Sequence, residues 1–201
     1  RGIDGFFSED EGRWYARFAR GLRGGVFVEV GSWKGRSTSF IGPVCNANGT
    51  RLVCVDHWLG ARDRLAEHYA RVLAEEDVEA TFRSNMRALG IEVEDAGACG
   101  GASITVPDRV HRVFLDGGHD GETVAADLEA WSRCLTSDGV LAGHDYSPKH
   151  PELCAAVDAF ASARDLVVRR GPRSIYWLAA REEVTLFGAS ADSVGSDMTG
   201  R

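Results

Sequence analysis

The sequence predicts an α/β protein with a doubly wound sheet that is mostly parallel, ends in an antiparallel strand and carries helices on both faces. Short apolar segments alternate with helical segments for five rounds, which is the pattern of a parallel sheet. The first apolar segment, VFVEV at 26–30, lacks the polar alternation of a half-exposed strand and therefore suits a central position. The last two segments, 166–169 and 174–180, are joined by a Gly-Pro turn that is too short for a crossover helix, so they pair antiparallel.

Seven short segments are predicted to be strands because they are rich in apolar residues and bounded by turn residues. They span residues 26–30, 51–55, 91–93, 111–115, 139–142, 166–169 and 174–180. The dipeptide Asn48-Gly49 turns the chain into the second of them. The segment 91–93 carries the weakest strand pattern of the set.

Helical segments separate these strands. They span residues 8–23, the stretch after the first strand, the charged insert 57–90, 121–134 and 151–163. Ser8 followed by Glu11 forms a capping box, which predicts the start of the N-terminal helix. Pro43 is expected to end or kink the second helix. In the segment 121–134, apolar residues recur at helical spacing and predict one buried face.

Composition limits the class of protein. The chain has 201 residues, of which 44% are hydrophobic, and we expect a single domain over residues 1–187 followed by a flexible Gly/Ser/Asp-rich tail at 188–201. A net charge of −7 argues against nucleic acid as a partner. No apolar run approaches the roughly 20 residues that cross a membrane. Five scattered cysteines without a CxxC pair indicate a reducing compartment, so we expect a cytoplasmic protein.

A glycine turn follows the first strand, in the segment EVGSWKGRST at 29–38. It lacks the close glycine pair that approaches a pyrophosphate, and Arg36 stands where a triphosphate-binding lysine would be. The free N–H groups at the start of the next helix, with the Ser37 hydroxyl, suit a carboxylate. Glu29 offers negative charge to an ammonium group. Asp56 ends the second strand, where an acid accepts hydrogen bonds from a ribose diol.

A ribose, a carboxylate and an ammonium without a phosphate describe S-adenosylmethionine. At this point the sequence resembles the class I S-adenosylmethionine-dependent methyltransferases, with their Rossmann-like fold. It is similar, more narrowly, to the metal-dependent small-molecule O-methyltransferases of the catechol O-methyltransferase type. The segments that carry the resemblance, within roughly residues 8–180, are VEVGSWKGRST, VCVDHW, Gly101-Ala102-Ser103, FLDGGH and LAGHDY.

The stretch DGGHDGETVAADLEAW…DGVLAGHDY most resembles a bacterial branch that includes sugar and natural-product tailoring methyltransferases. The resemblance implies a small-molecule acceptor and a homodimer. The residues that we expect to bind the cofactor are Glu29, Gly31, Ser32, Trp33, Gly35, Ser37, Asp56, Ser103 and Asp116.

Asp116 and Asp145 end neighbouring predicted strands, with His119 three residues after the first and His144 beside the second. The resemblance implies that Asp116, His144 and Asp145 hold a divalent cation and that His119 is the general base. The catechol enzymes usually carry an acidic residue at the position of His144. We expect Mg²⁺, which prefers oxygen ligands, whereas an imidazole ligand favours Mn²⁺, Fe²⁺ or Zn²⁺, and His144 could also turn away.

Other functions compete with this one. Two histidines and a carboxylate also form iron sites of hydroxylases, and a branch resembling cephalosporin hydroxylase shares these segments. The chain could also be a non-catalytic cofactor-binding module, or the acidic and histidine residues a hydrogen-bond network without metal.

Several of these residues also have a purely structural interpretation. Asp56 could cap a helix, and Trp33 and Trp58 could pack in the core instead of lining the cofactor. Lys34 and Arg36 are expected to be solvated or bound to acidic neighbours. The remaining histidines are expected to be structural or at the surface: His57, His68, His111 and His150.

Overall fold

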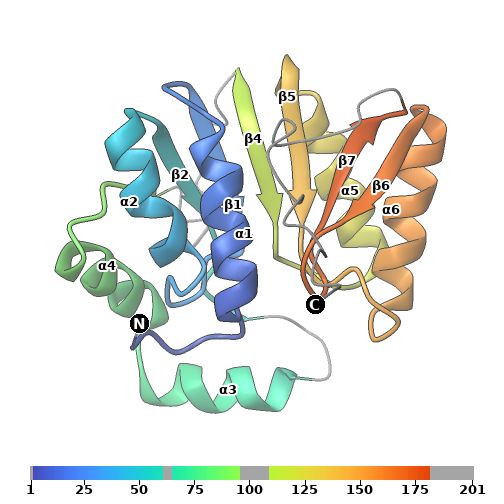
Figure 1. Cartoon of the computed structure of the whole chain (residues 1–201). Helices are drawn as coiled ribbons and strands as arrows, with labels where there is room; N and C mark the ends of the chain where they lie inside the picture. The colour runs from blue at the N-terminus through green and yellow to red at the C-terminus, as the bar shows by residue number, and fades with distance from the viewer. Residues whose placement is uncertain (1, 61–64, 96–108, 182–201) are drawn as a thin grey trace, which may run out of the picture.

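A seven-stranded sheet forms the centre of the computed structural model, which describes residues 2–60, 65–95 and 109–181 (Figure 1). Its strands are β1 (Val26–Val30), β2 (Arg51–Val55), β3 (Glu94–Asp95), β4 (Val110–Leu115), β5 (Leu135–Gly143), β6 (Leu166–Arg170) and β7 (Tyr176–Ala180). Their order is β3-β2-β1-β4-β5-β7-β6. The pairs from β3 to β5 are parallel, and β7 pairs antiparallel with both β5 and β6. The predicted sheet, with its inserted antiparallel last strand, is confirmed.

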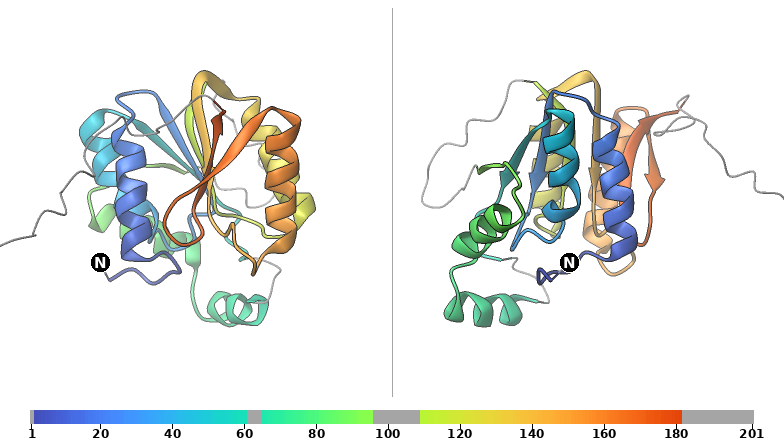
Figure 2. Two further views of the ribbon diagram at one scale, coloured as in Figure 1. Left: turned by 45° about the vertical axis from the view of Figure 1, so that its right-hand side comes forward. Right: turned by 60° about the vertical axis from the view of Figure 1, so that its left-hand side comes forward.

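Helices cover both faces of this sheet. They are α1 (Glu9–Arg20), α2 (Thr38–Asn48), α4 (Val78–Ala88), α5 (Gly121–Ser132) and α6 (Pro151–Ala163). A further helix, α3 (Ala66–Glu75), lies below the sheet in Figure 1. One core packs α1, α2 and α4 against one face, and a second core packs α5 and α6 against the other (Figure 2). Side chains alternate along β1, so that Phe27 enters the first core and Val28 the second. None of the helices in the described ranges is both long and apolar enough to span a bilayer.

The N-terminal helix begins where the capping box predicts. The Ser8 N–H donates to the Glu11 carboxylate at 2.9 Å, and the Glu11 N–H donates back to the Ser8 hydroxyl at 3.4 Å. The apolar face of α1 then buries Trp14, Tyr15 and Phe18. The two reciprocal bonds fix the start of this helix, and its buried apolar face sets its rotation on the sheet.

The third strand differs from the prediction. It lies at Glu94–Asp95, not at 91–93, and the Ile91 side chain packs into the core against Gly42. Pro43, expected to end or kink α2, does not end this helix, which continues to Asn48. The described part of the helical insert 57–90 holds α3 and α4, and Asp77 caps α4 by accepting from the Ala80 N–H at 2.9 Å. The predicted tail, 188–201, and Ser103 lie outside the described residues.

The loop after each central strand is hydrogen-bonded to the carboxyl end of a neighbouring strand. The N–H groups of Gly31, Asp116 and His144 each donate to the last residue of a neighbouring strand, at 2.8–2.9 Å. Gly31 has a φ of +88°, and a Cβ added there would lie 2.1 Å from the carbonyl oxygen of Asp116. A side chain at position 31 would therefore separate the β1 and β4 loops, between which the order of the sheet reverses.

We predict that Gly31→Ala lowers the free energy of unfolding by about 3 kcal/mol or more, because it combines backbone strain with a clash against backbone. Gly49→Ala is the matched control. Gly49 has a φ of +65° but open space around its Cβ position, so only the cost of a left-handed residue remains, about 1–2 kcal/mol. Urea titration measures both. Equal losses in the two variants would show that the contact with Asp116 is unimportant.

Candidate active site

Acidic and histidine side chains meet at the carboxyl ends of β4 and β5. Asp116 follows β4, and His144 and Asp145 follow β5. The Nδ1 atom of His144 lies 3.3 Å from Asp116 Oδ1 and 3.2 Å from Asp145 Oδ2. Each of the three offers a ligand atom, and these atoms all lie within 4.8 Å of one another. The structure thus brings together the three residues predicted to hold a cation.

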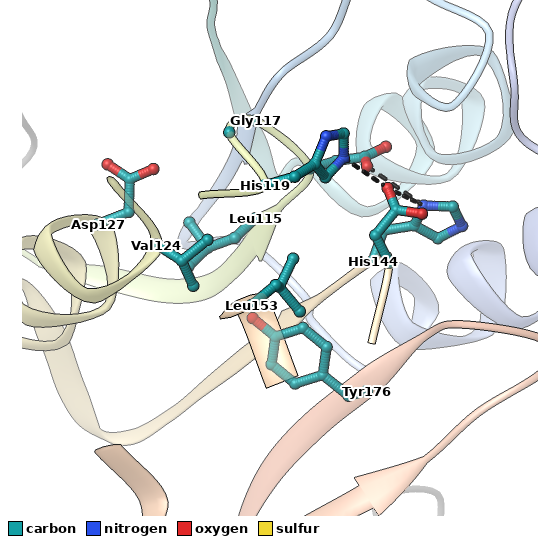
Figure 3. Close-up of a pocket in the computed structure, with 11 residues that line it drawn as sticks. Leu115, Gly117, His119, Val124, Asp127, His144, Leu153 and Tyr176 are labelled. Carbon is teal, nitrogen blue, oxygen red and sulfur yellow. Dashed lines mark hydrogen bonds and ion pairs between the residues drawn. The ribbon is translucent and has the colours of Figure 1, made fainter. Parts of the chain in front are cut away.

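His119 lies on the other side of Asp145. Its Nε2 atom is 2.8 Å from Asp145 Oδ2, and dashed lines in Figure 3 join the rings of His119 and His144 to carboxylates. Asp145 has a φ of +61°, a left-handed conformation that aspartate tolerates better than most residues. His119, the predicted general base, therefore lies within hydrogen-bond distance of a predicted cation ligand.

His150, expected to be structural or at the surface, joins this cluster. It is buried, its Nε2 atom lies 3.6 Å from Asp145 Oδ1, and its ring lies 4.4 Å from that of His119 between centroids. His150 is the residue before α6, and Pro151 marks that helix start in the sequence. Its closeness to His144-Asp145 in the chain was the available signal.

The second nitrogen of His144 is held by the N-terminal helix. Nε2 lies 2.8 Å from Glu11 Oε1 and 3.2 Å from the Ser174 hydroxyl, and the ring packs on Phe7 with centroids 5.1 Å apart. Glu11 is only 2% exposed. Its role could not be read from the sequence, because 133 residues separate the two partners.

The pKa values of His144 and its acidic neighbours depend strongly on one another's charge. Burial lowers the pKa of His144, but the charges of Asp116 and its other acidic neighbours outweigh burial and raise that pKa well above its ordinary value. Burial raises the pKa of Asp116. The pKa of Glu11 falls to about 2, because hydrogen bonds from His144 and Ser8 outweigh its burial. A positive charge at this point is therefore strongly favoured, whether a proton or a cation carries it.

Asp56 connects two of the loops at the sheet edge. Its Oδ2 atom accepts from the Trp33 N–H at 2.8 Å and its Oδ1 atom from the Trp58 N–H at 2.7 Å. Asp56 thus binds backbone, as in its structural interpretation. Each carboxylate oxygen still has a second acceptor site for a ligand hydroxyl. The Trp58 ring packs in the core against Phe82, as in its structural interpretation, and its buried indole N–H has no partner among the described residues.

Glu29 lies beneath the glycine turn with no exposed surface. It accepts from the Tyr15 hydroxyl at 3.1 Å, the Ser32 hydroxyl at 2.9 Å and the Thr38 hydroxyl. Ser37 is buried as well, and its hydroxyl does not cap α2. Glu29 was expected to contact an ammonium group and Ser37 a carboxylate. Both side chains are buried in this structure and are not accessible to a ligand. These side chains hold the turn together from below.

Comparison with known proteins identifies the family of this chain. A family model described as a methyltransferase domain matches residues 28–146, which is more than half of the chain. The chain belongs to this methyltransferase family. It is an S-adenosylmethionine-dependent methyltransferase, and the matched residues include the end of β1 from Val28, the glycine turn and the segment from Asp116 to Asp145.

Solved structures share the fold of this methyltransferase. Cofactor-bound Rv0187 from MTB is 14% identical with a TM-score of 0.59, covering 90% of this chain and 85% of that chain. The precorrin-6y C5,15-methyltransferase from Geobacter metallireducens is 15% identical with a TM-score of 0.57, covering 86% and 88%. Apo CalS11, described as a TDP-rhamnose 3'-O-methyltransferase of calicheamicin biosynthesis, is 18% identical with a TM-score of 0.53, covering 83% and 76%.

The N-terminal segment of the methyltransferase is held against the glycine turn by two basic residues. Lys34 is paired with Asp4, at 3.3 Å, and with Glu76, which confirms its expected binding to acidic neighbours. Arg36 donates to the carbonyl groups of Ile3, at 2.9 Å, and Phe7. Neither basic residue contacts the acidic and histidine cluster through these bonds, so both act in shaping the turn.

The tip of the glycine turn packs against α3 and α4. Trp33 has a φ of +46° and meets Tyr69 of α3 edge to face, with ring centroids 5.0 Å apart. Gly35 has a φ of +89°, and a Cβ there would lie 2.4 Å from Met86. Gly31 and Gly35 are thus required by the positive φ of the turn and by its close contacts. Trp33, a predicted cofactor-binding residue, packs against α3.

We predict that Glu29→Ala lowers the free energy of unfolding by roughly 3 kcal/mol or more, because three buried hydroxyl donors lose their acceptor. Glu92→Ala removes an exposed glutamate and should change it by less than about 0.5 kcal/mol. Chemical denaturation compares the two. Similar, small losses would mean that the buried acid is not needed to hold the turn.

Asp127 gives a pH-dependent prediction. Burial, with a smaller effect of Asp120, raises the pKa of Asp127 to about 6. The folded chain therefore binds this proton more tightly than the unfolded chain, so its contribution to stability falls as pH rises from about 4 to about 6. We predict that Asp127→Asn is more stable than wild type at pH 7.5, by about 1–2 kcal/mol after allowance for partial exposure, and that the difference disappears below pH 4. Urea unfolding at both pH values tests this, and a pH-independent difference would contradict it.

Proposed function

We propose that this methyltransferase transfers the methyl group of S-adenosylmethionine to a hydroxyl of a small molecule, assisted by a divalent cation at Asp116, His144 and Asp145. The observation that carries the proposal is the convergence of these side chains within 4.8 Å at the carboxyl ends of β4 and β5. Ligands of doubly wound sheets bind at this edge. The cluster adjoins the glycine turn, since Gly31 touches the backbone of Asp116.

The donor set fits a divalent cation. Two carboxylates supply the oxygen ligands that Mg²⁺ prefers, and an imidazole extends the choice to Mn²⁺, Fe²⁺ or Zn²⁺. If His144 donates from Nε2 to Glu11, its Nδ1 lone pair faces both carboxylates. This is the carboxylate–histidine arrangement that orients metal-binding imidazoles. A divalent cation held there lowers the pKa of a hydroxyl beside it by several units.

The cofactor side offers a matching set of groups. S-adenosylmethionine supplies a methyl group on a positively charged sulfur. Asp56 keeps acceptor sites for ribose hydroxyls. Asp116 adds negative charge near the turn, which suits a sulfonium. In this proposal Glu29 and Ser32 support the turn and do not contact the cofactor.

His119 is proposed to take the proton of the acceptor hydroxyl. Imidazole exchanges protons readily near neutral pH. Donation from His119 Nε2 to Asp145, at 2.8 Å, fixes the tautomer in which Nδ1 carries the lone pair. Asp145 thereby orients the ring, in the way that the third member of a catalytic triad orients its base.

The acceptor is proposed to be a small molecule such as a sugar or a phenol. The resemblance in fold to CalS11, a sugar O-methyltransferase, supports this choice. A cavity of about 10 Å³ beneath the cluster, lined by residues such as Val124, Leu153 and Tyr176, has room for about one water molecule (Figure 3). Because it cannot hold an acceptor, we place the acceptor on the outer side of the cluster.

Methyl transfer to a panel of phenols and nucleotide sugars, measured as formation of the demethylated cofactor, tests this function. We predict that EDTA lowers transfer by at least about 100-fold and that added Mg²⁺ or Mn²⁺ restores it. Asp145→Asn should lower transfer to a similar extent while calorimetry shows unchanged cofactor binding, because asparagine tolerates the left-handed backbone but loses the charge.

Asp138→Asn serves as the matched control for this experiment. Asp138 lies on β5 as well, is exposed, and belongs to the amino-terminal half of that strand. Its replacement should leave transfer unchanged. Transfer that persists in EDTA and in Asp145→Asn would contradict cation assistance. Oxygen consumption without use of the methyl donor would favour hydroxylation instead.

A further inference from the structure

A second group of potential metal ligands lies beside the first. The ligand atoms of His119, Asp145 and His150 also lie within 4.8 Å of one another. His119 Nε2 is 2.8 Å from Asp145 Oδ2, and His150 Nε2 is 3.6 Å from Asp145 Oδ1. The side chains are 14%, 24% and 8% exposed in the order His119, Asp145, His150, so a bound ion would be shielded but reachable.

The two groups share Asp145. Its Oδ2 atom faces His144 of the first group and His119 of the second, and its Oδ1 atom faces His150. A carboxylate can bridge two cations, and such pairs of cations lie roughly 3.5–4 Å apart in enzymes. The geometry therefore permits a second ion without removing Asp145 from the first site.

The backbone holds His150 in this place. Its N–H donates to the Ser147 carbonyl at 2.9 Å, and its carbonyl accepts from the Cys154 N–H at 3.1 Å at the start of α6. Pro151 follows at the first helical position, with its φ fixed for the helix. His150 at the start of α6 and Asp145 after the end of β5 are therefore preorganised, which favours metal binding.

Two imidazoles and one carboxylate differ in chemistry from the first group. Mg²⁺ and Ca²⁺ prefer oxygen ligands, whereas imidazole suits Mn²⁺, Fe²⁺, Co²⁺ and Zn²⁺. Three protein ligands that leave further coordination positions open are typical of sites that accept an exogenous ligand. We propose that His119, Asp145 and His150 form a second cation site, selective for transition metals over Mg²⁺, next to the group of Asp116, His144 and Asp145.

One consequence rests on the function proposed above. A cation on His119 Nε2 and a proton donated from Nε2 to Asp145 exclude each other, so the second ion would remove His119 from the tautomer that accepts a proton. Excess Mn²⁺ or Co²⁺ should then inhibit methyl transfer, and Mg²⁺ should not. Binding of the second ion itself does not depend on methyl transfer.

Metal binding to the full chain tests the proposal. After EDTA treatment and its removal, equilibrium dialysis against Co²⁺ with elemental analysis gives the number of bound ions, and the visible absorption of Co²⁺ reports their ligands. We predict two ions per wild-type chain, one in His150→Ala and one in Asp116→Asn. Dialysis against Mg²⁺ should give one ion in wild type and one in His150→Ala, because the second site selects against Mg²⁺.

His57→Ala is the control, because His57 is 56% exposed and belongs to neither group. It should bind two Co²⁺ ions. His150→Gln provides a second variant if thermal unfolding in EDTA shows that the alanine variant misfolds. The proposal is overturned if wild type binds a single Co²⁺ ion, or if both His150 variants bind Co²⁺ as wild type does. If methyl transfer proves independent of metal while Co²⁺ binding follows this pattern, the proposed function fails and the second site stands.

Discussion

The contact between Glu11 and His144 is the constraint on which the site depends. A single carboxylate serves two purposes, since Oε2 completes the capping box with Ser8 and Oε1 holds His144 Nε2. The rotation of α1 on the sheet is thereby linked to the orientation of a ring at the end of β5. Because Glu11 and His144 are both buried, neither can turn away without losing a buried hydrogen bond. The ring therefore presents Nδ1 to Asp116 and Asp145.

The glycine turn on the cofactor side is organised by the same principle. Glu29 accepts hydrogen bonds from buried hydroxyl groups. Asp56 accepts hydrogen bonds from the backbone N–H groups of Trp33 and Trp58, in the loops after β1 and β2. Lys34 and Arg36 fix the N-terminal segment over the turn. The carboxylates of Glu29 and Asp56 thus stabilise the loops on the cofactor side. Those of Asp116 and Asp145 instead face His144, where we propose that a cation binds.

Local signals predicted most of the fold. The capping box, the apolar strands and the short Gly-Pro connection each depend on neighbouring residues, and the structure has them where expected. The grouping of Asp116, His119, His144 and Asp145 followed from strand ends that meet at one edge. Glu11 and His150 were missed because packing of α1 and α6 onto the sheet brings them in. The hydroxyl partners of Glu29 were missed because a strand pattern does not show which polar groups lie beside it.

The most direct test is the affinity for Mn²⁺ at the group of Asp116, His144 and Asp145, measured in a His150→Ala background. Glu11→Gln keeps the capping box, which glutamine also completes, but removes the negative charge next to His144 Nε2. The account predicts Mn²⁺ binding that is about 10–100-fold weaker, measured at a temperature at which both variants are folded in EDTA. Glu9→Gln, in the same helical turn, should leave the affinity unchanged. Equal Mn²⁺ affinity in the Glu11 and Glu9 variants would contradict the account.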